Sequence, residues 1–278
     1  MSVDLQSKTS LCHYTEENVH KILEIHGKKL KDLEIDLETI KQWFKMQPHI
    51  PETPSDRLIV SYLIMNKFSI EKTKSRLEMN YSIRNVMPEF YCPLHPKILE
   101  SYRYCKLIAM PKLTKDLRRL CIIKYEDEPS FDVTIIFSRV IMFFELLAMY
   151  DINNGDEYIS DCRNVNLSII TKTKPTDFKK MVALFDKVYA NRFSVIHTVN
   201  LSSVGVSVFN MIKSLMKPKL RERMLMHKDI ESLKQYYSLD ILPKDYGGSC
   251  KSLDETADEH NTFLKGHDEF IEMDKNSC

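Results

Sequence analysis

Apolar residues recur at helical spacing along the first third of the chain. Residues 15–44 place Leu and Ile three and four positions apart, which predicts one or two helices before a proline-rich break. Ser55 is a good N-cap for the next helix. Ser69 opens another helix, which ends at Pro88 because proline cannot continue it. The pattern therefore predicts an all-helical N-terminal lobe over residues 1–92.

The pattern changes beyond residue 102, where short β-prone runs alternate with helical stretches. Near-continuously apolar strands separated by helices are typical of an α/β domain in which both faces of the sheet are covered. We place this domain at residues 93–248. The expected strands are residues 104–110, 120–125, 157–161, 193–199 and a short edge strand at 224–226. The expected helices are residues 131–150, 176–189, 204–217 and 230–237.

Residues 249–278 are polar and acidic, apart from Phe263, Leu264 and Phe270. Chain ends with few apolar residues are poorly ordered unless other elements tie them down. We therefore expect a loosely docked C-terminal tail.

Charge and composition narrow the class of protein. The 278 residues include 40 Lys and Arg against 39 Asp and Glu, so no global field favours nucleic acid. The seven cysteines are odd in number and scattered, without a CxxC pair, which fits reduced thiols better than a disulfide framework or a zinc site. The first ten residues lack the apolar core of a signal peptide, and the longest apolar stretch, residues 140–150, is too short to cross a bilayer. We expect a cytoplasmic protein that does not bind nucleic acid.

The sequence offers no motif for catalysis. Its six glycines form no phosphate-binding loop and no nucleophile elbow, and its nine histidines form no HExxH motif. His197 lies in an apolar run, which favours a satisfied core histidine over a catalytic one. Glu145 interrupts an apolar helix and could either accept a ligand hydroxyl or pair with a neighbouring cation. We expect no enzymatic activity, no metal site and no cofactor.

Two stretches of the chain resemble one known family. Residues 56–90 contain a leucine-rich helix, the Lys67-Phe68 turn and an amphipathic helix. Residues 189–248 contain RFSVIHTVN, KPKLRERMLMHKDIESLKQYY and the closing ILPKDYGG. In this order and spacing they are similar to the CRAL-TRIO family, whose members include carriers of tocopherol and of retinaldehyde. The chain departs from the family pattern at Asp161-Cys162-Arg163-Asn164, at Asn200-Leu201-Ser202 and at His227-Lys228.

The resemblance implies an N-terminal helical lobe followed by an α/β domain with a mixed sheet of about five strands and a helical lid. One small hydrophobic ligand would lie between the sheet and the lid. The predicted lid, residues 201–216, has an apolar stripe at three- and four-residue spacing, and the alternative is an ordinary helix that covers the core. By family position, the residues expected to line the pocket are Phe137, Ile141, Phe144, Leu147, Ile159, Met181, Leu184, Phe185, Phe193, Ile196, Val204, Val208, Phe209, Ile212 and Met216. Some of them could simply fill the core.

A basic cluster lies next to the predicted lid. In the family, a comparable cluster binds phosphoinositide headgroups, and the resemblance assigns that role to Arg192, Lys219 and Arg223. Ser194 stands where the family pattern has a further basic residue. The alternative is a solvated charged face with Glu222 among the cations. An anionic membrane surface is therefore the expected transient partner.

Three functions follow from these observations. The first is intracellular binding and transfer of a small hydrophobic lipid such as a retinoid, tocopherol, carotenoid or similar isoprenoid, with phosphoinositide-assisted release. The second is a scaffold or regulator of the same fold that docks a protein partner and transfers nothing. The third is a hydrolase or isomerase acting on a lipid, for which the sequence supplies no nucleophile with a matched base.

Overall fold

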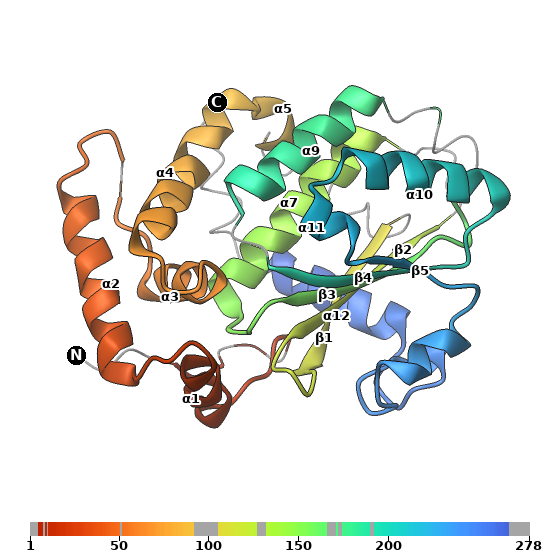
Figure 1. The fold of residues 1–278 in the computed structure, drawn as a ribbon, viewed down its shortest axis with the longest axis horizontal. Helices are drawn as coiled ribbons and strands as arrows, with labels where there is room; N and C mark the ends of the chain where they lie inside the picture. The colour runs from red at the N-terminus through yellow and green to blue at the C-terminus, as the bar shows by residue number, and fades with distance from the viewer. Residues whose placement is uncertain are drawn as a thin grey trace.

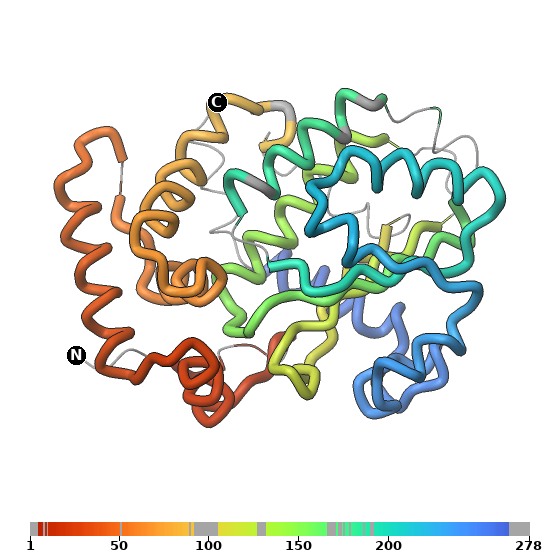
Figure 2. Tube along the Cα trace, viewed as in Figure 1, coloured from red at the N-terminus to blue at the C-terminus, as the bar shows by residue number. Residues whose placement is uncertain are grey.

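The computed structural model describes residues 5–7, 9, 11–50, 52–91, 105–126, 132–165, 171, 174–189 and 192–266 (Figures 1 and 2). A helical lobe, red to orange in Figure 1, stands beside a five-stranded sheet that carries helices on both sides. The predicted domain boundary at residues 92 and 93, the predicted element starts at 104 and 131, and Phe270 lie outside the described residues.

The N-terminal lobe consists of α1 (Glu16–Ile25), α2 (Leu30–Lys45), α3 (Asp56–Met65), α4 (Ile70–Val86) and α5 (Pro88–Tyr91). Local sequence fixes the helix starts, because Thr15 and Asn18 form a capping box before α1 and the Ser55 hydroxyl accepts a hydrogen bond from the Leu58 amide before α3. The prediction of an all-helical lobe is confirmed. Its core includes Val19, Ile22, Leu33, Leu37, Ile40, Phe44, Ile59, Leu63 and Leu77.

The sheet is mixed, as predicted, with strand order β1-β2-β3-β4-β5. Only the pair of β1 (Cys105–Leu113) and β2 (Arg119–Tyr125) is antiparallel. The strands β3 (Asp156–Asp161), β4 (Phe193–Val199) and β5 (Met224–Met226) follow in parallel. Parallel neighbours need long crossover connections. These contain α7 (Val133–Tyr150), α9 (Pro175–Lys187), and α10 (Ser203–Leu215) with α11 (Pro218–Arg221).

The two faces of the sheet bury different clusters, because successive strand residues point to opposite sides. On one face, Cys121 and Tyr158 belong to a cluster with residues of α7 and α9. On the other face, Ile122 packs with residues near the C-terminus, among them Leu233. This second cover includes the 3₁₀ helices η2 (Glu231–Gln235) and η3 (Lys244–Tyr246).

The α-helix expected at residues 230–237 is instead the short η2. Its turns close between residues three apart, as from the Leu233 amide to the Ile230 carbonyl oxygen at 2.9 Å. The Asp229 carboxylate accepts hydrogen bonds from the amide and the hydroxyl of Ser232. Leu233 is fully buried against the sheet. Tertiary packing therefore outweighs the helical spacing of the sequence and favours the tighter 3₁₀ turn in this short segment.

Helix α7 is long and apolar enough to cross a membrane by length and composition alone. However, 10 of its 18 residues are buried, and they contact the sheet, α3 and α5. A helix that is apolar on most sides is expected where several elements surround it. The composition of α7 therefore follows from its central place in the fold.

The segment after residue 249 is not a loosely docked tail in its described part. Residues Leu253–Lys265 form α12, which starts with a capping box between Ser252 and Glu255. Helix α12 packs along the edge strand β1, with Leu253 in the cluster on one face of the sheet and Leu264 in the cluster on the other. It covers an edge that would otherwise present unpaired backbone groups. The expectation was wrong because it rested on the overall polarity of residues 249–278 and overlooked this short amphipathic pattern.

A fully buried ion pair joins the end of α7 to the sheet and also contacts the segment before α1. The Arg119 guanidinium donates to both carboxylate oxygens of Asp151, at 2.8 and 2.7 Å, and both side chains are fully buried. Its remaining hydrogens reach the carbonyl oxygens of Met110, Pro111 and His13, at 2.8, 2.6 and 3.4 Å. Burial alone would lower the pKa of Arg119, but Asp151 raises it above its usual value. The pair therefore stays charged.

Asp151→Asn should destabilise the protein by about 3–5 kcal/mol, because it leaves the Arg119 charge buried without a counter-ion. Urea unfolding measures the free energy. Asp240→Asn is the matched control, since Asp240 pairs with Lys112 at 3.4 Å on the surface and both side chains are mostly exposed. That change should leave the free energy of unfolding close to that of the wild type, because exposed ion pairs contribute little. Equal losses in the two variants would contradict a structural role for the buried pair.

His260 on α12 should make stability depend on pH. It is 2% exposed, and burial lowers its pKa to about 4 from 6.5. The unfolded chain binds more protons between these values, so the free energy of unfolding should fall as pH decreases through this range. Between pH 7.5 and pH 5, His260→Leu should lose about 2 kcal/mol less of its free energy of unfolding than the control His20→Leu does. His20 is the control because it is exposed in the wild type. Identical pH profiles from urea unfolding would argue against a neutral buried His260.

Candidate functional site

Helix α7 supplies one wall of the predicted pocket. Asp132 caps its start by accepting hydrogen bonds from the amides of Thr134 and Ile135. The helical repeat then brings four predicted pocket residues to the cluster on the inner side of the helix, and all four are buried: Phe137, Ile141, Phe144 and Leu147. The structure brings these residues together as the spacing predicted.

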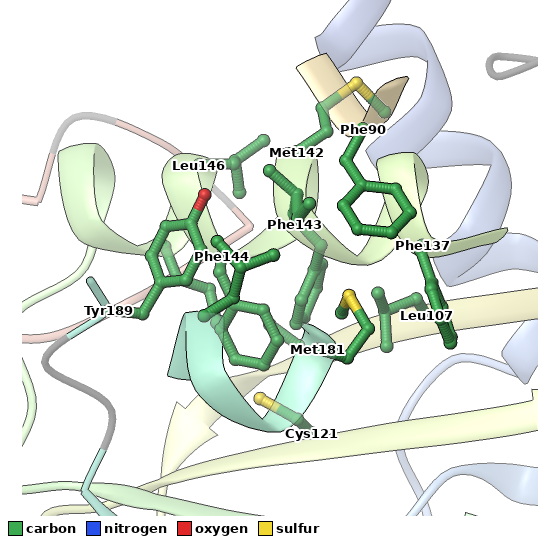
Figure 3. Close-up of a cluster of buried hydrophobic side chains, with 14 of the residues drawn as sticks. Phe90, Leu107, Cys121, Phe137, Met142, Phe143, Phe144, Leu146, Met181 and Tyr189 are labelled. Carbon is green, nitrogen blue, oxygen red and sulfur yellow. The ribbon is translucent and has the colours of Figure 1, made fainter. Parts of the chain in front are cut away.

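Helix α9 faces α7 across this cluster. Met181 and Leu184 are buried, and Phe185 is partly buried against them. Figure 3 shows Phe144 and Met181 close together, with Cys121 of the sheet beneath them. The predicted residues of α9 therefore meet those of α7 above the sheet.

Strand β4 contributes two residues to the same face through a bulge. Phe193 is opposite Asp156 and Val195 is opposite Glu157, so Ser194 is an extra residue in β4. Without the bulge, Phe193 and Ile196 would point to opposite faces, because they are three positions apart. With it, both pack against the cluster shared with α7 and α9, and both remain partly exposed.

Ile159 is the predicted pocket residue that lies on the wrong face. It is fully buried on the side covered by η2 and the C-terminal segments. The side chain that β3 presents to α7 and α9 is its neighbour Tyr158. The prediction placed Ile159 in the pocket by family position, whereas strand alternation gives the inner position to Tyr158. Ile159 therefore does not line this site.

Aromatic rings meet at the centre of the wall. Phe144 contacts Phe185, Tyr189, Tyr158 and Phe193 at centroid distances of 4.8, 5.9, 6.1 and 6.4 Å. Several of these contacts are edge-to-face, which is a favourable arrangement of ring quadrupoles. These five rings, from α7, α9, β3, β4 and Tyr189 just after α9, form an aromatic cluster.

The predicted lid corresponds to α10, which starts after the cap residue Ser202. Only Gly205 and Phe209 are buried on this helix. Val204 is 42% exposed, and Val208, Ile212 and Met216 are half-buried. In the described part of the chain, no α10 side chain belongs to a core cluster. The apolar stripe of α10 is therefore not part of the packed core.

Polar contacts fasten α10 at its C-terminal end. Arg221 of α11 donates to the carbonyl oxygens of Lys213, Ser214 and Met216, each at 3.2 Å. The Lys213 ammonium donates to the Met224 carbonyl oxygen of β5 at 2.9 Å. Figure 2 shows the chain passing from β4 through α10 and α11 back to β5. These contacts hold the lid to the edge of the sheet.

A buried polar network lies where the lobes meet. Glu145 of α7 accepts hydrogen bonds from Arg84 at 2.8 Å and Tyr189 at 3.3 Å. The Tyr189 hydroxyl also lies 2.9 Å from that of Tyr91. Burial raises the pKa of Glu145, while Arg84 and Tyr189 oppose that shift. Of the two roles left open for Glu145, the structure shows the pairing with a cation.

A small cavity of about 30 Å³ adjoins this network. Its lining joins the two lobes, because residues of α3 face residues of α7 and the start of β3 across it. The lining residues include Ser61, Tyr62, Met65, Phe144, Leu147, Asp156 and Tyr189.

Two of the three predicted headgroup residues approach one another. Burial lowers the pKa of Arg192, and the nearby positive charges of Arg118 and Arg223 lower it further. Arg192 donates to Asn154 at 2.8 Å and lies 3.5 Å from the His26 ring. Lys219 is exposed on α11, four residues before Arg223.

Two members of this basic cluster, Arg118 and His26, were missed in the sequence. Arg118 follows a turn far from Arg192 in the chain, and His26 belongs to the other lobe. Burial lowers the pKa of His26, helped by the nearby charges of Arg192 and Lys67. No local motif connects these positions, so only the fold could place them together. Ser194 occupies the bulge of β4 and does not extend the cluster.

His197 is a core residue, as predicted. It is 1% exposed and its Nδ1 lies 2.7 Å from Nε2 of His227, which joins β4 to β5. Burial, with a contribution from His227, lowers the pKa of His197 to about 4. Within the described residues, no three His, Cys, Asp or Glu side chains gather closely enough to hold a metal ion.

Comparison with known protein families identifies this architecture. Residues 104–248 match the CRAL/TRIO domain, and this match spans more than half of the chain. The chain belongs to the CRAL/TRIO family. Residues 29–98, which include α2 through α5, match a second family, described as the Pinta-like UBA domain.

Individual relatives agree with this assignment. The chain is 25% identical to the alpha-tocopherol transfer protein-like proteins of Mus musculus and Homo sapiens over 268 residues, which is 94% of this chain and 78% of theirs. Clavesin-1 of Rattus norvegicus is 28% identical over 102 residues, 36% of this chain and 29% of its own. Among solved structures, Sfh5 superposes with a TM-score of 0.52 at 18% identity, covering 75% of this chain and 79% of Sfh5. The last likeness shows a shared fold.

Proposed function

We propose that the protein binds one small hydrophobic lipid between α7, α9, β4 and the lid α10, and carries it between membranes. The observation that carries this proposal is the half-buried stripe of Val208, Ile212 and Met216, which belongs to no described core cluster. An ordinary core helix would bury such a stripe against its own fold. A lipid beneath α10 supplies the missing apolar partner. The similarity to proteins named for tocopherol transfer supports this class of cargo.

The cargo class is a retinoid, tocopherol, carotenoid or similar isoprenoid. Removing about 20 ligand carbons from water stabilises the complex by roughly 16 kcal/mol, at about 0.8 kcal/mol per carbon. Lost translational and rotational freedom opposes this by about 4–15 kcal/mol. The remaining free energy suffices for useful affinity without any chemical step. The proposed activity is therefore binding and transfer, with no catalysis and no cofactor.

Release would occur at an anionic membrane surface. Arg192, Arg223 and Lys219 are the proposed phosphoinositide contacts, and Arg118 and His26 adjoin them. Val204 and Met211 are exposed on the nearby lid. A membrane that binds the open lid more tightly than the closed one shifts the population towards release. The buried free thiols Cys12, Cys105, Cys121 and Cys162 fit the cytoplasm as the compartment in which this transfer takes place.

A second function is supported by the aromatic cluster. Phe144, Phe185 and Phe193 contact one another, which partly fills the space between helices and sheet. A protein of this fold whose pocket is filled by its own side chains would act as a scaffold that docks a protein partner. Mass spectrometry of lipid extracted from the purified protein separates the two functions, because only the carrier should contain stoichiometric lipid.

Ile212→Asp should weaken lipid binding at least about tenfold, because it places a charge against the apolar cargo. Titration with a tritiated isoprenoid measures the affinity, and far-UV circular dichroism should remain unchanged. Asn210→Asp is the control on the exposed side of the same helix. It should bind lipid as the wild type does. Global unfolding of Ile212→Asp would instead favour a helix that only covers the core.

Lys219→Ala should reduce binding to phosphatidylcholine vesicles that contain phosphatidylinositol bisphosphate by about fivefold, since one cation near an anionic surface contributes about 1 kcal/mol. Co-sedimentation measures binding, and the difference should shrink as salt is added. Lys265→Ala, an exposed lysine at the end of α12, is the control and should bind normally. Equal binding of all three proteins would contradict a headgroup site that includes Lys219.

A further inference from the structure

Tyr158 places a buried hydroxyl in an otherwise apolar wall. The residue lies in the middle of β3 and is 2% exposed. Its ring contacts Phe193 and Phe144 at centroid distances of 5.3 and 6.1 Å. Among the residues that the structure describes, its hydroxyl oxygen finds no hydrogen-bond partner. Its register neighbour on β2, Cys121, offers only a thiol, which bonds weakly.

The other described side chains of this wall are less suited than Tyr158 to bond a polar group of a ligand. The phenylalanine and aliphatic residues of α7, α9 and β4 carry no hydrogen-bonding side-chain group. The hydroxyl of Tyr189 is already engaged with Tyr91 and Glu145. Buried polar groups in folded proteins nearly always have a partner, and an exception requires an explanation. Ligand pockets are mostly apolar with a few polar groups that orient the ligand.

Tyr158 lies next to partly exposed residues of β4. Its register partner on β4 is Ile196, which is partly exposed, as is Phe193 beside it. Adjacent strands are about 4.8 Å apart, so Tyr158 lies one strand deeper than this exposed surface. Helix α10 runs along this side of the sheet in Figure 1, and Lys213 ties it to β5. A lipid lying along β4 can therefore place one end at Tyr158.

We propose that Tyr158 is the polar anchor of the cargo: its hydroxyl donates a hydrogen bond to an oxygen of the bound lipid. The cargo is then an alcohol or carbonyl-bearing lipid and not a bare hydrocarbon. The hydrocarbon part lies along Phe193 and Ile196, and the oxygen points towards β3. This inference rests on the proposed carrier function and adds to it the chemistry and orientation of the cargo.

The anchor is tested with two lipids that differ by one hydroxyl, phytol and phytane, each in tritiated form. Tyr158→Phe removes only the oxygen atom and keeps the ring. Its affinity for phytol should fall about tenfold, while its affinity for phytane stays that of the wild type. The melting temperature of the lipid-free variant should be unchanged or higher, because the substitution removes an unpaired buried hydroxyl.

Tyr189→Phe is the matched control, because its hydroxyl is bonded within the protein. It should lower the melting temperature of the lipid-free protein and change the affinities for phytol and phytane by the same factor. Saturable phytol binding with equal affinity in wild type and Tyr158→Phe would overturn the anchor and leave the carrier function standing. Equal losses for both lipids in Tyr158→Phe would also overturn it. No saturable binding of either lipid by the wild type would overturn the anchor and count against the carrier function itself.

Discussion

The fold depends on one buried charge pair. Asp151 is the C-cap of α7, and Arg119 begins β2, so their bond fixes the end of the central helix against the sheet. The same guanidinium binds the carbonyl oxygen of His13, which leads into the N-terminal lobe. A buried arginine is tolerated only when its donors are satisfied, and here the carboxylate and three carbonyl groups satisfy them. The position of α7, and with it the wall formed by Phe144 and Leu147, follows from this constraint.

Helix α10, the proposed lid, and helix α7 of the same CRAL/TRIO domain differ in how much of each is buried. Helix α7 buries more than half of its residues, whereas α10 buries two of thirteen. Elements with few buried apolar contacts open at lower free energy than the core. A rigid wall and a weakly held cover can therefore coexist in one domain. In the proposed carrier, the binding surface would keep its shape while the cover moves.

Periodicity in the sequence was enough to predict the helical lobe, the five strands and helix α10, because these depend on local spacing. The role of α10 as a lid came from the family resemblance. The residues of α7 and α9 that were predicted to line the pocket lie together because of the same local spacing. Ile159 was misplaced because β3 carries one large apolar or aromatic side chain on each face, Tyr158 and Ile159, and the sequence does not say which face meets α7. The residue types around Ser194 do not indicate the bulge, which only the strand register shows. Helix α12 did leave a signal, the Ser252 and Glu255 capping box, which overall polarity obscured. The partners of Glu145 and Arg192 come from distant segments, so only the tertiary structure could reveal them.

The bonds from Arg221 to the last turn of α10 give the lid a pivot at one end. The helix has 13 residues, so it is about 20 Å long at 1.5 Å per residue. A rotation of about 20° around that pivot would move the far end, near Val204, by about 7 Å, while the pivot end stays almost still. An opening of this kind is a wedge and not a uniform gap. Cargo would then enter and leave lengthwise at the Val204 end, and a small angular motion would be enough to admit it.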